Sequence, residues 1–166
     1  HVDASFLRMR DDIQSAVSLA FLDERNDAHY MFYKQPPRTL KGFIHPTVEA
    51  DDIVQFGSYY ALNPHIRPQV KAFLEYAHGQ GAILYYDLNF RRTYQDRIKE
   101  LLPAIHENFR LATVVRGSAD DFEVMYGLRD AEEIYHRHIA PYCPLFLCTC
   151  GAENIMLCTP KGSSRF

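Results

Sequence analysis

Three polar side chains that could bind an anionic ligand follow the apolar run at residues 83–86: Asp87, Asn89 and Arg91. The run is long enough for a buried parallel strand, and ligands of open α/β sheets bind beyond the carboxyl ends of the strands. The guanidinium fork of Arg91 matches the oxygens of a phosphate group. The alternative interpretation is an ordinary buried strand that ends in a surface ion pair.

Small or polar residues also follow three other apolar runs, at residues 53–56, 113–115 and 145–148. Short apolar runs that alternate with helical patterns are typical of βαβ units and a parallel sheet. Because the carboxyl ends of parallel strands open on one edge, we expect these residues to lie near Asp87 and to complete a ligand site. They are Gly57, Ser58, Ser118, Asp121, Thr149 and Gly151.

A β-hairpin precedes this α/β pattern. Residues 16–22 and 28–33 have the composition of strands, and they flank a polar turn at residues 24–27. Pro36-Pro37 ends the second strand, because proline cannot donate a hydrogen bond to a ladder. We therefore divide the chain into a connection at residues 1–14, a hairpin at residues 15–35 and part of an α/β core at residues 36–166.

The predicted helices connect the later strands in the order β-α-β-α-β-α-α-β-β. Asn63 is expected to cap the first helix, with Pro64 in its first turn. Pro103 is expected to split or kink the second helix. Ser118 and Asp121 come close to a capping box at the start of the third.

The composition is that of one soluble globular domain or most of one: 47% of the 166 residues are hydrophobic and 23% are charged. A net charge of −3 argues against a nucleic-acid or membrane-surface partner. No apolar run reaches the length of about 18 residues that indicates a membrane span, and we expect a cytoplasmic protein. We expect no closing helix or strand at residues 163–166, so the sequence reads as an internal part of a longer protein.

The four cysteines lie in the last quarter of the sequence and lack the spacing of a zinc site. We interpret them as buried, reduced thiols that pack as small apolar side chains. His136 and His138 are two residues apart on a predicted helix, so we interpret them as exposed side chains rather than metal ligands. The cysteines are Cys143, Cys148, Cys150 and Cys158.

Five segments follow the order and spacing of a known family. They are the hairpin that ends in Phe32-Tyr33-Lys34, Phe56-Gly57-Ser58, Asp87-Leu88-Asn89-Phe90-Arg91, residues 114–121, and Thr149-Cys150-Gly151. The third segment stands where the family has Asp-Pro-Asn-x-Arg. On these segments, nearly the whole chain resembles the central part of a ribokinase-like (PfkB) carbohydrate kinase, and it is most similar to the fructokinase and sugar-kinase members.

This resemblance implies a three-layer α/β/α fold with a mostly parallel sheet and a small β lid hairpin, through which a homodimer can form. It implies ATP-dependent phosphorylation of a hydroxyl of a small-molecule sugar, with Mg2+ bound. On the sugar and phosphate side it implies roles for Asp87, Asn89, Arg91, Gly57, Ser58, Phe32 and Lys34. On the nucleotide side it implies roles for Ser118, Thr149 and Gly151, with Asp121 acting on Mg2+ through water.

The sequence departs from the family pattern at three points. Ser118 and Asp121 stand in place of the asparagine and glutamate of Asn-x-x-Glu, and Asn154 stands in place of the last glycine of Thr-x-Gly-x-x-Gly. Asparagine tolerates a positive φ, so we expect the turn at Asn154 to be kept. The Gly-Ala-Gly-Asp segment that carries the catalytic base in the family does not occur in this sequence, so no base is assigned.

Two other functions compete with a kinase. A non-catalytic sugar- or nucleoside-binding homologue would keep the fold without the chemistry, and the serine at position 118 favours this alternative. An unrelated dinucleotide-binding domain is disfavoured, because no G-x-G-x-x-G follows any expected strand.

Overall fold

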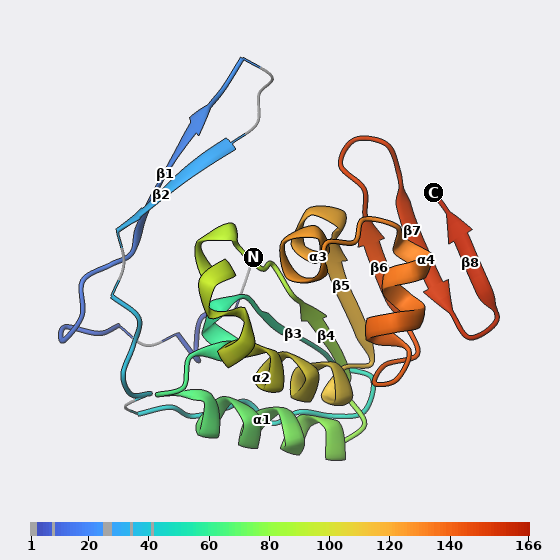
Figure 1. Cartoon of the computed structure of the whole chain (residues 1–166). Helices are drawn as coiled ribbons and strands as arrows, with labels where there is room; N and C mark the ends of the chain where they lie inside the picture. The colour runs from blue at the N-terminus through green and yellow to red at the C-terminus, as the bar shows by residue number, and fades with distance from the viewer. Residues whose placement is uncertain (1–2, 8, 25–27, 34, 41) are drawn as a thin grey trace. The chain divides into compact units, whose positions relative to one another are not determined.

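The computed structural model describes residues 3–7, 9–24, 28–33, 35–40 and 42–166. The chain forms two compact units, His1–Pro46 and Thr47–Phe166 (Figure 1). Residues 36–46 group with the hairpin in the first of these units.

The first unit contains the predicted hairpin. Strand β1 (Val17–Leu22) pairs antiparallel with β2 (Ala28–Tyr33). Side chains along β1 are exposed, and Phe32 of β2 is partly buried and stacks on Tyr30 with ring centroids 5.7 Å apart. Lys34, which the sequence placed at the end of the hairpin, lies outside the described residues.

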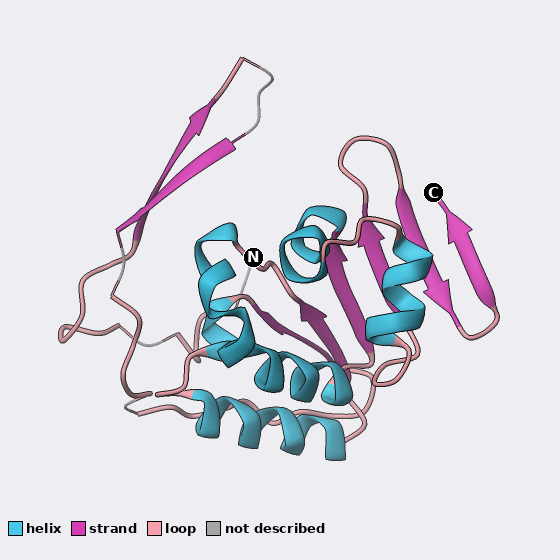
Figure 2. Ribbon diagram, in the orientation of Figure 1, coloured by secondary structure: helices cyan, strands magenta, loops and turns pink. Residues whose placement is uncertain are grey.

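The second unit is built on a six-stranded, mostly parallel sheet (Figure 2), which confirms the predicted fold class. Four strands run parallel in chain order, and the last two pair antiparallel. The strands are β3 (Ile53–Gly57), β4 (Ile83–Asp87), β5 (Val114–Ser118), β6 (Phe146–Thr149), β7 (Ile155–Thr159) and β8 (Gly162–Arg165).

Strand β8 corrects the expectation that residues 163–166 form no closing strand. Its sequence Gly-Ser-Ser-Arg is short, polar and fully exposed, so it has no apolar alternation from which a strand could be predicted. Pairing of its backbone with β7, from Thr159↔Gly162 to Met156↔Arg165, accounts for the strand.

The helices follow the predicted order, with short 3₁₀ turns (η1 and η2) and a π-helical turn (η3) added. The segment η3 continues α4 directly, so together they fill the single helix predicted at residues 131–139. The bounds are η1 (Tyr59–Leu62), α1 (Arg67–Gly79), η2 (Arg92–Arg97), α2 (Ile98–Leu111), α3 (Ala119–Tyr126), α4 (Ala131–Ile134) and η3 (Tyr135–Ile139). None of the helices in the described part of the chain has the length and hydrophobicity that crossing a bilayer would require.

Two helix predictions were wrong in detail. Asn63 caps a turn rather than α1: its side-chain oxygen accepts a hydrogen bond from the N–H of His65 (3.1 Å), and the helix begins at Arg67. Pro68 therefore occupies the first turn instead of Pro64. Pro103 does not split α2, which runs unbroken on both sides of it, because neighbouring turns bury apolar side chains in the core.

One face of the sheet carries the core. Tyr86, Val115 and Phe146 are fully buried on this face, together with Phe109 of α2 and Phe122 of α3. Full burial of Val115 or of one of these phenylalanine side chains stabilises the fold by about 1.5–3 kcal/mol. The alternate strand positions, which point to the opposite face, are only partly buried; they include Tyr85, Asp87, Val114, Arg116, Leu147 and Thr149.

Arg67 joins the first two helices on the packed side. Its guanidinium donates to the carbonyl oxygens of Ala61 (2.6 Å) and Ala104 (3.1 Å), to the Asn108 side chain (2.9 Å) and to the Glu107 carboxylate (2.6 Å). Spreading one charge over four acceptors in this way satisfies several polar groups at a partly buried interface.

Candidate ligand site at the carboxyl edge of the sheet

The four parallel strands bring the predicted loops to one edge. Gly57 of β3 lies opposite Asp87 of β4, Asp87 lies opposite Arg116 of β5, and Ser118 of β5 lies opposite Thr149 of β6. Residues that are about 30 positions apart in the sequence therefore lie opposite one another on neighbouring strands. This is the arrangement that the sequence predicted from the apolar runs.

Gly57 allows β3 and β4 to approach closely at this edge. A Cβ atom at position 57, where φ is 156°, would lie 1.8 Å from the carbonyl oxygen of Asp87. That oxygen instead accepts a hydrogen bond from the N–H of Ser58 (3.1 Å). Only glycine fits this contact, which fixes the loop after β3 to the end of β4.

Two residues at the edge have backbone conformations that non-glycine residues seldom adopt: Ser58 with φ 53° and Asn89 with φ 40°. Such conformations cost of order 1–3 kcal/mol each and tend to occur at functional sites. Both residues were singled out from the sequence, but for their polar side chains and not for their backbone.

The turn after β4 holds Asn89 and Arg91 by burying the residue that precedes each of them. Leu88 and Phe90 are buried, whereas Asn89 and Arg91 are partly exposed. The N–H of Leu88 donates to the carbonyl oxygen of Arg116 (2.9 Å), and the carbonyl oxygen of Arg91 accepts from Tyr94 at the start of η2 (2.9 Å). Leu88 and Phe90 thus anchor the turn in the core, while Asn89 and Arg91 stay partly accessible.

Arg116 links three strand ends and was not among the predicted site residues. Its guanidinium donates from Nη1 to Asp87 Oδ1 (3.1 Å) and from Nη2 to Thr149 Oγ1 (3.2 Å). A signal for it was present in the sequence: Arg116 interrupts the apolar run of β5 one position before Gly117. A cation at such a position in a sheet interior needs a partner from an adjacent strand.

Ser118 and Asp121 form the predicted capping box at the start of α3. The N–H of Ser118 donates to Asp121 Oδ2 (2.8 Å), and the N–H of Asp121 donates to Ser118 Oγ (3.0 Å). Burial raises the pKa of the Asp121 carboxyl, while the hydrogen bonds from Ser118 and the charge of Arg116 oppose that rise. The pair therefore has a structural role at the edge.

The turn after β6 differs from the expectation for Asn154. The residue with a positive φ is Gly151, at 61°, whereas Asn154 is not among the described residues with a positive φ. The turn closes instead through the N–H of Cys150, which donates to the carbonyl oxygen of Asn154 (2.9 Å). Gly151 alone supplies the left-handed position in this turn, so Asn154 needs no unusual conformation.

The sequence also made predictions for Phe32, for metal ligands, for the cysteines and for the histidines. Phe32 belongs to the other compact unit, and no group of three or more His, Cys, Asp or Glu side chains in the described ranges could hold a metal ion. All four cysteines have free thiols, three of them buried and Cys150 partly so. His138 is not exposed as predicted, because its ring stacks on Tyr126 with centroids 3.7 Å apart.

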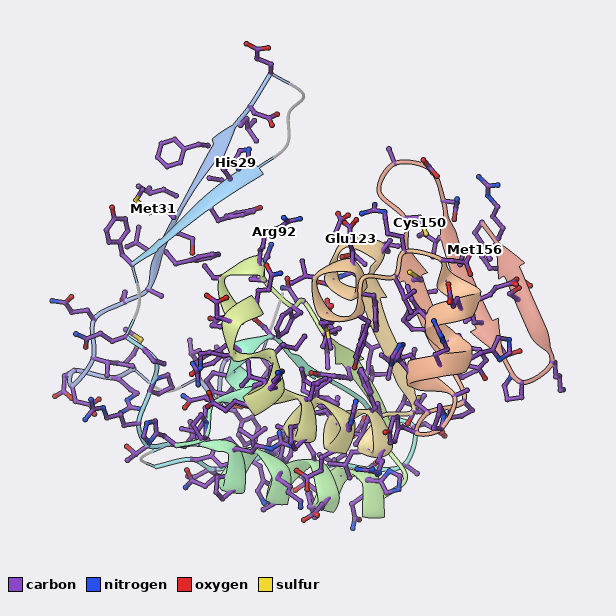
Figure 3. The ribbon with its side chains drawn as sticks, in the orientation of Figure 1. His29, Met31, Arg92, Glu123, Cys150 and Met156 are labelled. Atoms are coloured by element: carbon purple, nitrogen blue, oxygen red, sulfur yellow. The ribbon has the colours of Figure 1, made fainter. Side chains whose placement is uncertain are left out.

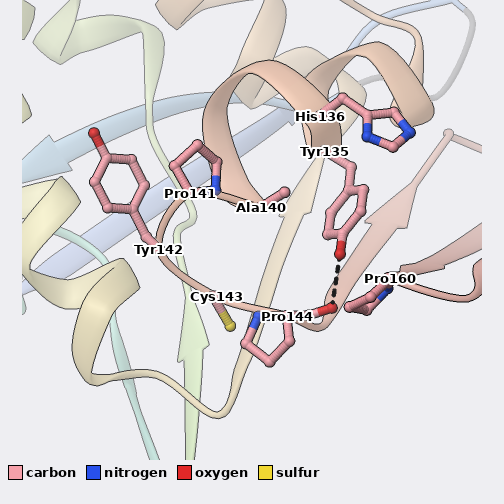
Figure 4. A pocket seen from close by; sticks show the side chains of 8 residues that line it. All are labelled: Tyr135, His136, Ala140, Pro141, Tyr142, Cys143, Pro144 and Pro160. Atoms are coloured by element: carbon pink, nitrogen blue, oxygen red, sulfur yellow. Dashed lines mark hydrogen bonds between the residues drawn. The ribbon is translucent and has the colours of Figure 1, made fainter.

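A cavity of about 360 Å³ lies at the opposite, amino end of the parallel strands. It forms where the segment before β6 meets η3 and the turn after β7, and the hydroxyl of Tyr135 donates to the carbonyl oxygen of Pro144 there (3.1 Å; Figure 4). The sequence did not predict this cavity. Its lining residues are Tyr135, His136, Ala140, Pro141, Tyr142, Cys143, Pro144 and Pro160.

No protein-family model matches the sequence, and no curated protein matches it either. Solved structures do match, and they show that the chain has the fold of ribokinase-like carbohydrate kinases. Fructokinase from Vibrio cholerae O395, bound to fructose, ADP and calcium ion, superposes with a TM-score of 0.80 at 22% identity, over 99% of this chain and 54% of that one.

Two further structures agree on the fold. Aminoimidazole riboside kinase from Salmonella enterica, complexed with aminoimidazole riboside and an ATP analog, gives a TM-score of 0.67 at 21% identity, over 99% of this chain and 53% of that one. Fructokinase from Xylella fastidiosa gives 0.70 at 18% identity, over 94% and 52%. The chain thus spans about half the length of the structures that it matches.

The close contact at Gly57 predicts a large effect of a single methyl group. Gly57→Ala should lower the free energy of unfolding by more than about 3 kcal/mol, because the clash is with backbone and cannot be relieved by rotating a side chain. Gly79→Ala, at the end of α1 with nothing within 4 Å of the added Cβ, is the matched control and should be neutral or stabilising by up to about 1 kcal/mol. Urea denaturation of both variants measures the difference, and equal stabilities would contradict the proposed contact.

The capping box predicts outcomes of different size for its two members at neutral pH. Ser118→Ala should lower the free energy of unfolding by about 1 kcal/mol, because it removes the acceptor for the N–H of Asp121. Asp121→Asn keeps an oxygen for the N–H of Ser118 and removes a buried negative charge. It should therefore lower the free energy of unfolding by less than Ser118→Ala does.

The two variants also differ in pH dependence. Because the folded-state pKa of Asp121 is raised, the native protein binds more protons than the unfolded chain in the window just above the ordinary pKa, and the stability that Asp121 contributes falls as pH rises through that window. The stability of Asp121→Asn relative to the unmodified protein should therefore increase from about pH 4 to about pH 7. A decrease over that range would contradict the raised pKa.

Proposed function

We propose that this chain is part of an ATP-dependent carbohydrate kinase of the fructokinase type, which transfers a phosphoryl group to a sugar hydroxyl. The observation that carries the proposal is that Asn89 and Arg91 follow the end of β4 and Thr149 ends β6, at the same carboxyl edge of a sheet whose fold is that of sugar kinases. Fructose is bound in the Vibrio cholerae fructokinase and aminoimidazole riboside in the Salmonella enterica kinase. A small-molecule sugar or sugar-like nucleoside is therefore the proposed substrate class.

The polar groups of the edge suit phosphoryl transfer, which depends on positioning and charge neutralisation more than on covalent chemistry. We assign Arg91 to the transferred phosphate and Asn89 to the sugar hydroxyls, with Asp87, Gly57 and Ser58 shaping the same side of the site. On the nucleotide side we assign Ser118, Thr149 and Gly151 to ATP.

Mg2+ would enter with ATP rather than occupy a site made of protein ligands alone. The described side chains form no group of three metal ligands, and Asp121 Oδ2 already accepts from Ser118. Mg2+ commonly keeps several waters and binds through one or two carboxylates together with substrate phosphates, so contact from Asp121 through water fits this edge. When bound, the ion would neutralise charge on the phosphates.

The hairpin at residues 15–35 is proposed to act as a lid over the sugar, with Phe32 and Lys34 excluding water that would otherwise hydrolyse ATP. Residues 36–166 are then part of the kinase core. No residue of this sequence is assigned as the catalytic base, so the activity is proposed for the longer protein, which we place in the cytoplasm.

A non-catalytic sugar- or nucleoside-binding protein is the second candidate. It is favoured by one observation: the side-chain oxygens of Ser118 and Asp121 each accept a hydrogen bond from the backbone N–H of the other residue, and both thereby cap the start of α3. A binder of this kind would retain sugar affinity without releasing ADP.

Two neighbouring arginines test the kinase proposal in the full-length protein. Arg91→Ala should reduce fructose phosphorylation at least about tenfold, because the guanidinium neutralises charge on the transferred phosphate. Arg92→Ala is the matched control: Arg92 is exposed at the start of η2 (Figure 3), and its removal should leave activity within about twofold.

A coupled ADP-release assay over fructose, ribose and nucleosides measures both variants and identifies the sugar. Equal activities of the two variants would contradict the role of Arg91. Sugar binding without ADP release in the unmodified full-length protein would favour the second candidate.

The hairpin also supports a homodimer as the proposed assembly. Val17, Leu19, Met31 and Tyr33 lie on one face, in cross-strand pairs, and each is at least 42% exposed. His29 and Met31 extend from β2 (Figure 3). An isolated two-stranded sheet cannot cover such a face by itself, so we propose that a second copy of the hairpin covers it.

Charge on that face should break the dimer. Leu19→Lys in the full-length protein should shift the sedimentation coefficient from dimer to monomer, because a lysine ammonium is costly to bury. Ser18→Lys, on the opposite face of the same strand, should leave the dimer intact. A monomeric unmodified protein would overturn the proposal.

A further inference from the structure

Arg116 lies between the two sides of the candidate site, the sugar side after β4 and the nucleotide side at the end of β6, and it was assigned to neither. It lies on β5, between β4, which leads into the turn of Asn89 and Arg91, and β6, which ends at Thr149. Its guanidinium bonds to Asp87 on one side (3.1 Å) and to Thr149 on the other (3.2 Å). Its carbonyl oxygen also accepts the N–H of Leu88 (2.9 Å), so one residue holds the exit from β4 with both backbone and side chain.

The two side-chain bonds come from different nitrogens of one rigid, planar group. Because the guanidinium is rigid, it cannot move to change one of these hydrogen bonds without also changing the geometry of the other. A flexible lysine ammonium could change one hydrogen bond alone. The side chains of Arg116 and Asp87 are 30% and 25% exposed, so their ion pair is only partly screened by water. Displacement of Asp87 is therefore transmitted to Thr149 through a stiff connection.

The bond to Thr149 also decides where its hydroxyl points. A threonine hydroxyl has one hydrogen to donate and two lone pairs with which to accept. Because Thr149 Oγ1 accepts from Arg116, its hydrogen is directed away from the guanidinium and can be donated to another acceptor. An anionic oxygen of a nucleotide phosphate is an acceptor of this kind.

We propose that Arg116 is a positioning residue that couples sugar binding on the β4 side to nucleotide binding on the β6 side. It touches neither ligand; it orients the Asp87 carboxylate and the Thr149 hydroxyl together. This inference rests on the proposed function, because it takes a sugar and ATP as the two ligands.

The test measures the dissociation constant of ATP by calorimetry, with and without saturating fructose, in the full-length protein. Fructose should tighten ATP binding about fivefold or more in the unmodified protein, as expected for coupling between sites. Arg116→Met, which keeps the apolar stem and removes the fork, should bring that ratio close to one, and Arg116→Lys should restore only part of it. A purely structural role would lower stability without changing the ratio.

Arg129→Met is the matched control. Arg129 also pairs with two acidic side chains, Asp120 (2.7 Å) and Glu123 (2.6 Å), but on the exposed surface of α3. Its loss should leave the ratio unchanged. Thr149→Val should by itself bring the ratio of the ATP dissociation constants close to one. Adding Arg116→Met to Thr149→Val should then cause no further change in that ratio, because both substitutions break the same connection.

The outcomes separate this inference from the proposed function. If the unmodified protein binds both ligands cooperatively but releases no ADP, the kinase proposal fails while the role of Arg116 is still decided by the ratio in Arg116→Met. If Arg116→Met keeps the full ratio, or the unmodified protein shows none, the inference is overturned. If ADP is released in either case, the kinase proposal stands.

Discussion

The contact between the backbone of Gly57 and the carbonyl group of Asp87 constrains the whole carboxyl edge of the sheet. With no side chain at position 57, β3 approaches β4 closely enough for the N–H of Ser58 to bond to Asp87. The row of paired residues then continues through Arg116. Each loop that leaves the edge is thereby fixed relative to its neighbour, and a binding site made from several loops needs that rigidity.

The division of the sheet into two unlike faces explains why polar side chains gather where they do. One face is filled by aromatic and aliphatic side chains from the strands and helices. Asp87, Arg116 and Thr149 point to the other face, where burial is incomplete and ionised groups keep part of their hydration. An ion pair at the end of this face can therefore order neighbouring strands without the desolvation penalty of a deep core position.

Much of this architecture could be predicted from the sequence, because the parallel strands are continuous apolar runs and the loops after them are polar. The capping box of Ser118 and Asp121 could also be predicted, since it depends on residues three apart. Strand β8 could not, because its pairing comes from backbone and its side chains show no pattern. The start of α1 was misplaced because Asn63 is as suitable for capping a turn as for capping a helix.

The site was predicted less completely than the fold. Asp87 and Thr149 were identified individually, but Arg116, which joins them, was missed because its role depends on the register of three strands. The unusual backbone of Ser58 and Asn89 depends on tertiary contacts in the same way. Nothing in the order of residues specifies how far one strand slides past the next, and the distances at this edge follow from that register.

The most direct measurement is the fate of the terminal phosphate of ATP in the presence of the full-length protein and fructose. Incubation with ATP labelled at the γ-phosphate, followed by separation of the sugars, should place the label on fructose or on a related sugar, and no label should move when sugar is omitted. Label that remains on ATP with every sugar, although the sugars bind, would contradict the account of this sheet edge as half of a phosphoryl-transfer site.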